Sequence, residues 1–377
     1  MNNRFEKVFP QDQISKRERI ERAFAFKPLD RAPLHEQLSY NSRVISHYTG
    51  KDCSDFHFTV QDVGETIRKT MDSCFIPLSP KGTDQFTDEF GFVLKNDNWT
   101  TWYLSRPFTD EKGAKEWLVK KTKALKEEKK NFNPGSRRKT YRAYMENIQS
   151  LIGDTVHIDW SIGTGFCAAF DAMGLETYIY FSYDYPEVLQ EYMDVSCDLA
   201  VAKVAAGADQ SLSPVVLIAE DFSTKGGPIF PTDFLDRYHF PYVKCLAREW
   251  HSHGIKVLYH SDGNYKSVIP NLIACEVDGF YCLEPNCGMD VVALVHEYPQ
   301  MVWAGGVDGV DLMERGTPEE VRRTVTEHIT KTDVLKRGGM LVATSSEINP
   351  PIRVENFVAM VETVGSLRNE DFGKILP

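Results

Sequence analysis

The sequence is short of positive charge, of long apolar runs and of closely spaced cysteine pairs. Lysines and arginines total 43 against 54 aspartates and glutamates, and this excess of negative charge argues against a nucleic-acid partner, which needs a basic face. No run approaches the roughly 18 apolar residues of a membrane span, and residues 1–6 lack the apolar core of a secretion signal. The eight cysteines show no CxxC spacing, so we expect reduced thiols in a cytoplasmic protein.

In its hydrophobic and charged fractions, the sequence has the composition of an ordinary globular protein. A hydrophobic fraction of 42% and a charged fraction of 26% support a large apolar core under a solvated surface. A chain of 377 residues can form two or three domains, yet α/β barrels of this size often form one. We therefore predict a single domain over residues 1–377, with an N-terminal helical extension at 1–30 and an aromatic-rich insertion at 84–108. The aromatic side chains of this insertion either form a local core or cover a ligand pocket.

Short apolar runs that end in polar residues recur through the second half of the chain. Residues 215–219 precede Glu220, residues 256–259 precede His260, and residues 279–283 precede Glu284. Apolar runs of four to six residues with β-branched and aromatic members are typical of strands buried on both faces. Together with candidates in the first half they give eight predicted strands, which begin near residues 32, 72, 155, 215, 256, 278, 301 and 340.

Helical segments separate the predicted strands. Those expected in the second half cover residues 185–206, 232–253, 265–275, 290–298, 317–330 and 354–367. The segment at 317–330 begins with an N-cap threonine, a proline and two glutamates, which is a favourable helix start. Alternating strands and helices indicate right-handed βαβ units and a parallel sheet. The eight predicted strands favour closure of this sheet into a barrel over an open sheet. The predicted fold class is therefore α/β, a single (β/α)8 barrel of the TIM type.

The carboxyl ends of the strands in such a barrel meet at one rim, where enzymes of this architecture place their chemistry. The predicted catalytic residues at this rim are Glu220, Asp221, His260, Asp262 and Glu284. The predicted substrate-binding residues are His35, Asp159, Lys225, Asp308, Ser346 and Glu347. His260 and Asp262 are also the candidate metal ligands, because a histidine with carboxylates suits zinc or, without a metal, a general acid–base pair. Crowded carboxylates repel one another, which raises some of their pKa values.

Several of these positions also have a structural interpretation. Glu284 can fix a turn, Asp308 can cap the following helix, and Glu347 can accept backbone hydrogen bonds. Lys225 lies in a glycine-rich loop, where it either meets an anionic group or remains solvated. The glycines of residues 163–165 either cradle an anion or form a turn, and the motif is too short to decide.

At these positions the sequence resembles the uroporphyrinogen decarboxylase superfamily, and the resemblance covers most of the chain. The segments that carry it are residues 227–242, 260–264, 283–285, 305–308, 315–321 and 350–356. The family is similar in fold to the predicted barrel. It contains porphyrinogen decarboxylases and a large group of methyltransferases that work with corrinoid proteins.

Departures from the family patterns separate this chain from the better-known branches. The decarboxylases carry an Arg-Gln-Ala-Gly-Arg stretch near the first strand and a histidine on the last, whereas residues 38–43 here read Leu-Ser-Tyr-Asn-Ser-Arg and the last strand has Ser346. Asp72 stands where the decarboxylase aspartate is expected. The thiol-directed methyltransferases hold zinc with a His-x-Cys pair and a later cysteine. His260 matches that pattern, but Asp262 and Ser346 replace the cysteines, so the resemblance implies a third branch.

The resemblance implies a methyltransferase that moves a methyl group between a small methylated substrate, such as a methyl ether, and the corrinoid (cobalamin) of a separate protein. His260, with Glu220 or Asp262, then binds Zn²⁺ or donates a proton to the leaving oxygen. Decarboxylase relatives are dimers, so a homodimer is a further expectation. One alternative is a decarboxylase or lyase on a small acid, favoured by Lys225 and Arg43. The other is a barrel that binds a small molecule without catalysis.

Overall fold

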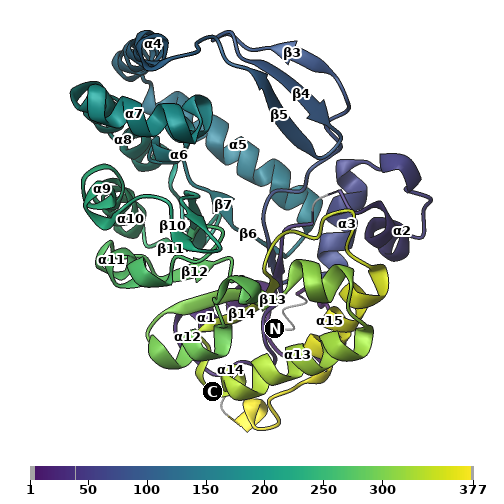
Figure 1. Ribbon diagram of the computed structural model, residues 1–377. Helices are drawn as coiled ribbons and strands as arrows, with labels where there is room; N and C mark the ends of the chain where they lie inside the picture. Colours follow the sequence, from purple (N-terminus) through teal and green to yellow (C-terminus); the bar gives the residue numbers. More distant parts are fainter. Residues whose placement is uncertain (1–4, 39, 375–377) are drawn as a thin grey trace.

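Eight parallel strand positions close into a barrel in the computed structural model, which describes residues 5–38 and 40–374 (Figure 1). In chain order they are β1 (His35–Glu36), β2 (Ser73–Cys74), β6 (Val156–His157) continued by β7 (Asp159–Trp160), β8 (Val215–Ala219), β11 (Lys256–His260), β12 (Gly279–Tyr281), β13 (Val302–Val307) and β14 (Met340–Thr344). β6 pairs with β2 and β7 pairs with β8. A parallel bridge between Leu34 and Val342 joins the first position to the last. The predicted barrel and its eight strands are confirmed.

A layer of helices surrounds the barrel (Figure 1). The helices are α1 (Lys16–Phe24), α2 (Ser42–Thr49), α3 (Val60–Thr70), α4 (Glu111–Lys130), α5 (Pro134–Ile152), α6 (Phe166–Met173), α7 (Leu175–Asp184), α8 (Pro186–Gly207), α9 (Thr232–Tyr238), α10 (Phe240–Ser252), α11 (Ile269–Ala274), α12 (Val291–Glu297), α13 (Pro318–Lys331), α14 (Val334–Arg337) and α15 (Val354–Ser366). Among the described residues, no helix combines the length and apolar character needed to cross a bilayer.

The helix boundaries follow local chemistry. α13 begins as expected, with a capping box in which Thr317 and Glu320 bond to each other's backbone N–H groups. The single helix predicted over 232–253 is instead divided at His239 into α9 and α10. The division lies just before Pro241, which has no N–H to continue the hydrogen-bond ladder and whose ring crowds the preceding turn.

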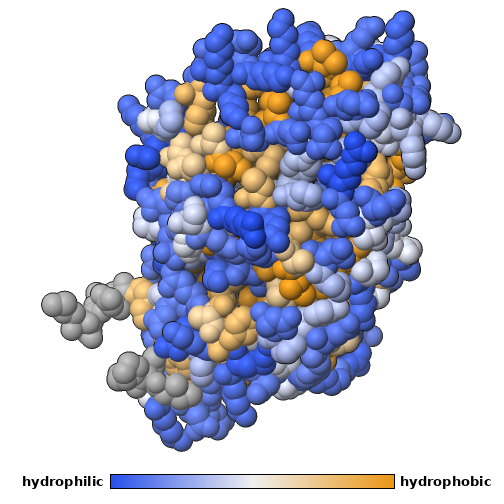
Figure 2. Space-filling view, turned by 90° about the vertical axis from the view of Figure 1, so that its left-hand side faces the viewer, coloured by the Kyte–Doolittle hydropathy of each residue, from blue (hydrophilic) through white to orange (hydrophobic). Residues whose placement is uncertain are grey.

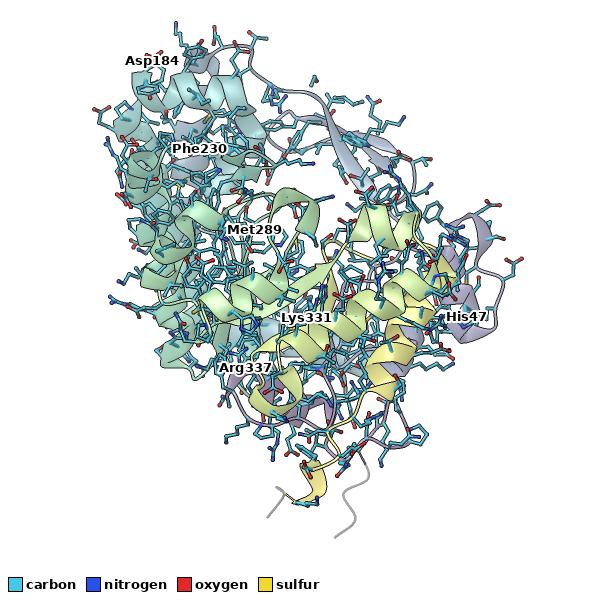
Figure 3. All side chains as sticks on the ribbon, turned by 60° about the horizontal axis from the view of Figure 1, so that its bottom comes forward. His47, Asp184, Phe230, Met289, Lys331 and Arg337 are labelled. Atoms are coloured by element: carbon cyan, nitrogen blue, oxygen red, sulfur yellow. The ribbon has the colours of Figure 1, made fainter. Side chains whose placement is uncertain are left out.

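The core has two shells, inside the barrel and between the barrel and the helices. Along β8, Val215 and Leu217 face the barrel interior, whereas Val216 and Ile218 face the helices, and this explains why the run is apolar throughout. The outer shell contains Phe230, which is buried and labelled in Figure 3. The outer face drawn in Figure 2 is mostly hydrophilic, with scattered apolar groups.

A three-stranded antiparallel sheet is inserted in the chain between β2 and β6, and it projects from the barrel at the upper right of Figure 1. It consists of β3 (Gln85–Thr87), β4 (Val93–Asp97) and β5 (Thr100–Ser105). The buried ring of Phe92 contacts Phe108 and Trp117, so part of the aromatic cluster forms a small local core. Phe86 and Trp102 remain exposed. A single-domain organisation with this sheet as an insertion stays a prediction.

A buried ionic cluster fills the amino end of the barrel. The Asp72 carboxylate accepts hydrogen bonds from Arg19 Nη1 at 2.7 Å, Arg31 Nη1 at 2.6 Å and the Leu34 backbone N–H at 2.8 Å. Burial by itself raises the pKa of Asp72, but the charges of Arg31 and Arg19 outweigh it and hold the pKa below its ordinary value. Asp72 immediately precedes β2, at the end of the barrel opposite the rim where barrel enzymes react. The decarboxylase role that the resemblance suggested for it therefore does not fit its position.

Glu36 joins the first strand to the last at the carboxyl end of the barrel. Its fully buried carboxyl group lies 2.6 Å from the backbone N of Thr344 and 2.8 Å from Thr344 Oγ1. Burial raises the pKa of Glu36 to about 8, although the Thr344 bonds act in the opposite direction. Thr344 Oγ1 also contacts the carbonyl oxygen of Ser346. Because a hydroxyl has one proton to donate, a protonated Glu36 that donates to Thr344 Oγ1 satisfies both contacts.

We expect Asp72→Asn to lower the free energy of unfolding by about 3–5 kcal/mol at pH 7, because two buried guanidinium groups lose their shared counter-charge. Urea denaturation measures this. The matched control is Asp311→Asn, which removes an exposed ion pair with Arg315 and should cost no more than about 1 kcal/mol. Equal effects of the two substitutions would contradict the importance of the buried cluster.

We expect Glu36→Gln to stabilise the protein at pH 8 by about 1–3 kcal/mol, and progressively less toward pH 5. The folded state keeps a proton on Glu36 up to about pH 8, whereas the unfolded chain releases it above its ordinary pKa of about 4.3. The free energy of unfolding of the wild type therefore falls as the pH rises between these values, whereas a neutral amide at this position does not titrate. Denaturation curves at pH 5 and pH 8 measure the difference in free energy of unfolding between the variant and the wild type, with the exposed Glu319→Gln as control. A difference that does not vary with pH would show that Glu36 is ionised in the folded protein.

Candidate functional site

The carboxyl ends of six barrel positions enclose a pocket of about 210 Å³. Its lining residues follow or end β1, β7, β8, β11, β12 and β14, and they are Gln37, Trp160, Asp221, His260, Asp262, Tyr281, Cys282, Ser346 and Glu347. The pocket therefore lies at the rim where the sequence placed the chemistry. Five of the eleven predicted site residues line it.

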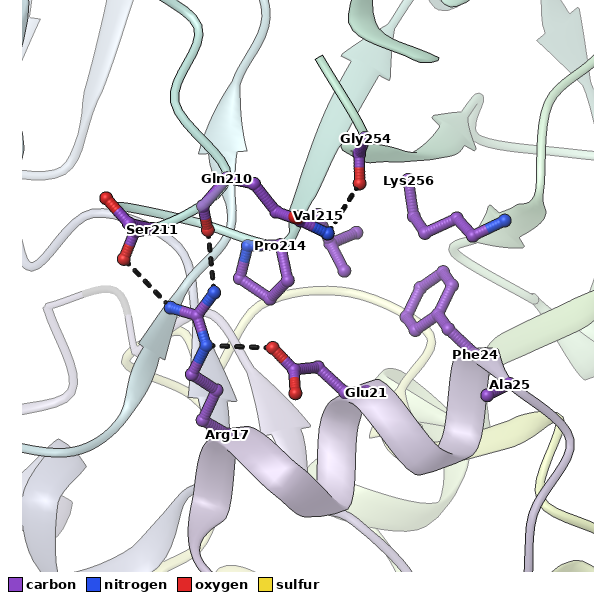
Figure 4. Close-up of a pocket in the computed structure, with 10 residues that line it drawn as sticks. All are labelled: Arg17, Glu21, Phe24, Ala25, Gln210, Ser211, Pro214, Val215, Gly254 and Lys256. Carbon is purple, nitrogen blue, oxygen red and sulfur yellow. Dashed lines mark hydrogen bonds and ion pairs between the residues drawn. The ribbon is translucent and has the colours of Figure 1, made fainter. Parts of the chain in front are cut away.

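A larger cavity of about 690 Å³ opens at the opposite, amino end of the barrel (Figure 4). Its charged side chains already have partners. Arg17 donates to the carbonyl oxygens of Gln210 and Ser211 and pairs with Glu21, and Lys256 pairs with Asp278. This cavity is larger than the rim pocket. The rim pocket, however, brings together the imidazole, carboxylate and thiol groups of His260, Asp262 and Cys282, so we take it as the candidate functional site.

His260, the last residue of β11, is the centre of the rim pocket. Its Nε2 lies 3.3 Å from Asp221 Oδ1 and 3.8 Å from Asp262 Oδ1. The backbone N–H of Asp262 also donates to Asp221 Oδ1 at 2.8 Å. Burial by itself lowers the pKa of His260, but the hydrogen bond and negative charges of its neighbours, led by Asp221, raise it above the ordinary value. For Asp221, burial raises the pKa, yet its bond to His260 brings it below the ordinary range.

Cys282 brings a thiol beside His260 and Asp262. Its Sγ donates a hydrogen bond of 3.1 Å to Asp262 Oδ1, and ligand atoms of the three residues all lie within 4.8 Å of one another. Imidazole nitrogen, carboxylate oxygen and thiolate sulfur are all ligands that Zn²⁺ accepts, and three protein ligands leave a fourth position open. Burial and then the charge of Asp262 raise the pKa of the Cys282 thiol well above its ordinary value, and a bound cation would reverse this effect.

Aromatic rings and the end of the last strand complete the pocket. The Tyr281 ring lies 5.4 Å from the His260 ring. Trp160 meets Phe75 edge-on at 5.8 Å and remains 50% exposed. Glu347 Oε2 accepts a 2.9 Å hydrogen bond from Gln37 Nε2. The predicted site did not include three further lining residues, Gln37, Trp160 and Tyr281. Each stands at the end of a strand or directly after it, and this position is the same signal by which the sequence identified the other lining residues.

Two of the predicted catalytic carboxylates hold loops instead of lining the pocket. Glu220 is buried and accepts hydrogen bonds from the Thr164 N–H at 2.6 Å, Thr164 Oγ1 at 2.6 Å and the Cys167 N–H at 2.9 Å. The glycine-containing loop at 163–165 thus cradles an anion, but that anion is the protein's own side chain. Glu284 accepts from the Gly263 N–H at 2.8 Å and from Cys287 Sγ at 3.2 Å.

Four predicted substrate-binding residues also lie away from the pocket lining. Asp308 accepts from the N–H groups of Val310 and Asp311 in the helical segment Gly309–Glu314, which is the capping role. Asp159 accepts from Tyr141 of α5 at 2.7 Å. His35 is fully buried beneath the pocket, with its ring 5.3 Å from that of Tyr281. Lys225 is exposed in the turn between β9 (Ser223–Thr224) and β10 (Gly227–Pro228).

Two solved structures resemble this one to different degrees, and only the first is similar enough to indicate a shared fold. A methyltransferase from Methanosarcina mazei matches with a TM-score of 0.63 and 14% identity, over 94% of this chain and 99% of that one. A B12-independent methionine synthase from Shewanella sp. W3-18-1, solved with selenomethionine, matches with a TM-score of 0.32 and 12% identity, over 90% of this chain and 98% of that one. No curated protein matches the sequence.

The family comparison is more specific. The model of the uroporphyrinogen decarboxylase (URO-D) family matches residues 118–367. This range includes the strands from β6 to β14 and eight of the nine described pocket-lining residues, all except Gln37. The match covers well over half of the chain. The protein therefore belongs to the uroporphyrinogen decarboxylase family.

Proposed function

We propose that this protein is a methyltransferase that moves a methyl group between a small methylated substrate and the corrinoid of a partner protein. The observation that carries the proposal is the convergence of His260, Asp262 and Cys282 at the rim of the barrel. Membership of the URO-D family and the fold shared with a Methanosarcina mazei methyltransferase support it. Methyl ethers are among the substrates that the proposal admits.

The charge of the pocket argues against the decarboxylase alternative. Among the described residues that line the pocket, there is no lysine or arginine to balance a substrate carboxylate. Arg43 instead donates to the carbonyl oxygens of Pro350 and Pro351, and Asp72 lies in the ionic cluster at the far end of the barrel. A carboxylated substrate would meet the carboxylates of Asp221 and Asp262 at the rim, with His260 as the one cationic group among the described lining residues.

The residues present fit a zinc ion. His260 Nε2, Asp262 and Cys282 would hold it, and zinc would supply a Lewis acid that stabilises negative charge on a leaving or attacking atom. The chain's own groups support this arrangement. The Asp221 carboxylate accepts from the Asp262 backbone N–H, and the N–H of Gly263, which follows Asp262, donates to Glu284.

Without a metal, His260 would act as the proton donor. Its raised pKa keeps a larger share of the imidazole protonated near neutrality than in water, and Asp221 stabilises the imidazolium. A proton delivered from His260 Nε2 to the leaving oxygen would let that oxygen depart as a neutral alcohol instead of a poorly leaving alkoxide. Metal binding and proton donation use the same nitrogen, so a metal measurement separates the two roles.

We expect the purified protein to bind one equivalent of zinc, and Cys282→Ala to weaken this binding at least tenfold because a thiolate ligand is lost. Titration against a chromophoric chelator measures the affinity. The matched control is Cys245→Ala, which removes an exposed thiol on α10 and should leave the affinity unchanged. No zinc binding, or the same affinity in both variants, would rule out the Cys282 ligand set and leave His260 as a proton donor.

Methyl transfer itself is tested with substrates that carry an isotopically labelled methyl group. The protein is incubated with a reduced corrinoid protein and a panel of methyl ethers, methyl thioethers and methylated ammonium ions. We expect label on the corrinoid with at least one class, and a loss of at least tenfold in rate for His260→Ala but not for Cys245→Ala. Failure of the whole panel to label the corrinoid would contradict the proposed function.

A further inference from the structure

Carboxylates outnumber cationic groups in the rim pocket. Asp221 and Asp262 line it, and no lysine or arginine does so among the residues described. A protonated His260 would offset only one of these two carboxylates. A zinc ion held by Asp262 and a Cys282 thiolate would have its two charges cancelled by those ligands, which leaves the Asp221 carboxylate. The pocket therefore favours a positively charged ligand with or without a metal.

Aromatic surfaces face the same space. Trp160 and Tyr281 both line the pocket. The Trp160 ring is held by an edge contact with Phe75 at 5.8 Å, yet half of its surface stays open. A tryptophan or tyrosine face attracts a cation placed within about 6 Å of the ring centre, most strongly when the cation is poorly hydrated. Carboxylates combined with indole and phenol rings suit an ammonium ion whose charge is covered by methyl groups.

The size of the pocket restricts the ligand further. At about 210 Å³ it is smaller than the ~300–1,000 Å³ typical of sites for drug-sized molecules, so a compact group enters and a bulky one does not. We propose that the rim pocket binds the methylated head of a quaternary ammonium ion. This inference rests on the proposed function, because it identifies the quaternary ammonium ion as the methyl donor of the proposed methyl transfer.

The chemistry of such a donor agrees with the charge of the site. When the methyl group is transferred, the C–N bond breaks, its electron pair stays on nitrogen, and the reduced corrinoid contributes the electron pair of the new bond to carbon. The leaving group is a neutral tertiary amine that needs no proton. An ether would instead leave as an alkoxide, an anion that the carboxylates of Asp221 and Asp262 repel unless it is protonated.

Two probes of nearly the same shape isolate the charge. Choline and 3,3-dimethylbutan-1-ol differ in having nitrogen or carbon at the branched centre, so only choline carries a positive charge. We expect calorimetry on the zinc-loaded and on the chelator-treated protein to give at least tenfold tighter binding of choline. Equal binding of the two compounds, or tighter binding of the neutral one, would overturn the inference.

Variants then locate the binding. Trp160→Leu should weaken choline binding about threefold to thirtyfold through loss of the cation–π contact, whereas Trp160→Phe, which keeps an aromatic face, should lose less. Trp102→Leu, at another exposed tryptophan on β5, is the matched control and should not change the affinity. If Trp160→Leu fails to fold, the Trp160→Phe variant and Asp221→Asn, which should also weaken choline binding, retain the test. Choline binding that none of the rim variants alters would overturn the assignment to this pocket.

The inference and the proposed function fail in different ways. If methyl ethers label the corrinoid but choline does not bind, the inference is wrong and the proposed function stands. If choline binds at the rim but no methylated compound labels the corrinoid, the proposed function is wrong and the cation site stands.

Discussion

The register between β11 and β12 determines which groups meet at the rim. His260 lies beside Tyr281 in this pairing, so the residues that follow each strand, Asp262 and Cys282, reach the same side of the pocket. A shift of one residue in this pairing would move Cys282 away from Asp262 and leave His260 without the neighbouring thiol. Barrel closure maintains the register, since a closed sheet has no free edge along which a strand can slip.

The two ends of the barrel use the same kinds of side chain for opposite purposes. At the amino end, Asp72 meets two arginines and its charge is balanced in full, which stabilises the fold and leaves no reactive group. At the carboxyl end, Asp221 and Asp262 meet a single histidine, and the remaining charge is available to a ligand. This contrast in pairing, and not the number of acidic residues, distinguishes a structural cluster from a site.

The sequence predicted the barrel well because buried parallel strands leave a strong one-dimensional pattern, and residues 215–219 and 340–343 are apolar on both faces. It predicted the site less well because a strand end does not show where the next side chain points. Glu220 and Asp221 are adjacent, yet Glu220 turns toward the helical layer and Asp221 toward the pocket. Cys282 was hard to recognise because an isolated cysteine in an apolar run has the pattern of an ordinary buried thiol, and only the pairing of β11 with β12 places it next to Asp262.

We propose that the rim holds a metal-supported methyl-transfer site whose thiol, Cys282, directly follows β12. X-ray absorption at the zinc edge of the zinc-loaded protein measures the ligands of the metal. We expect one sulfur scatterer at about 2.3 Å with nitrogen or oxygen scatterers at about 2.0–2.2 Å, and loss of the sulfur signal in Cys282→Ala. A wild-type spectrum without sulfur, or a sulfur signal that persists in Cys282→Ala, would contradict this proposal.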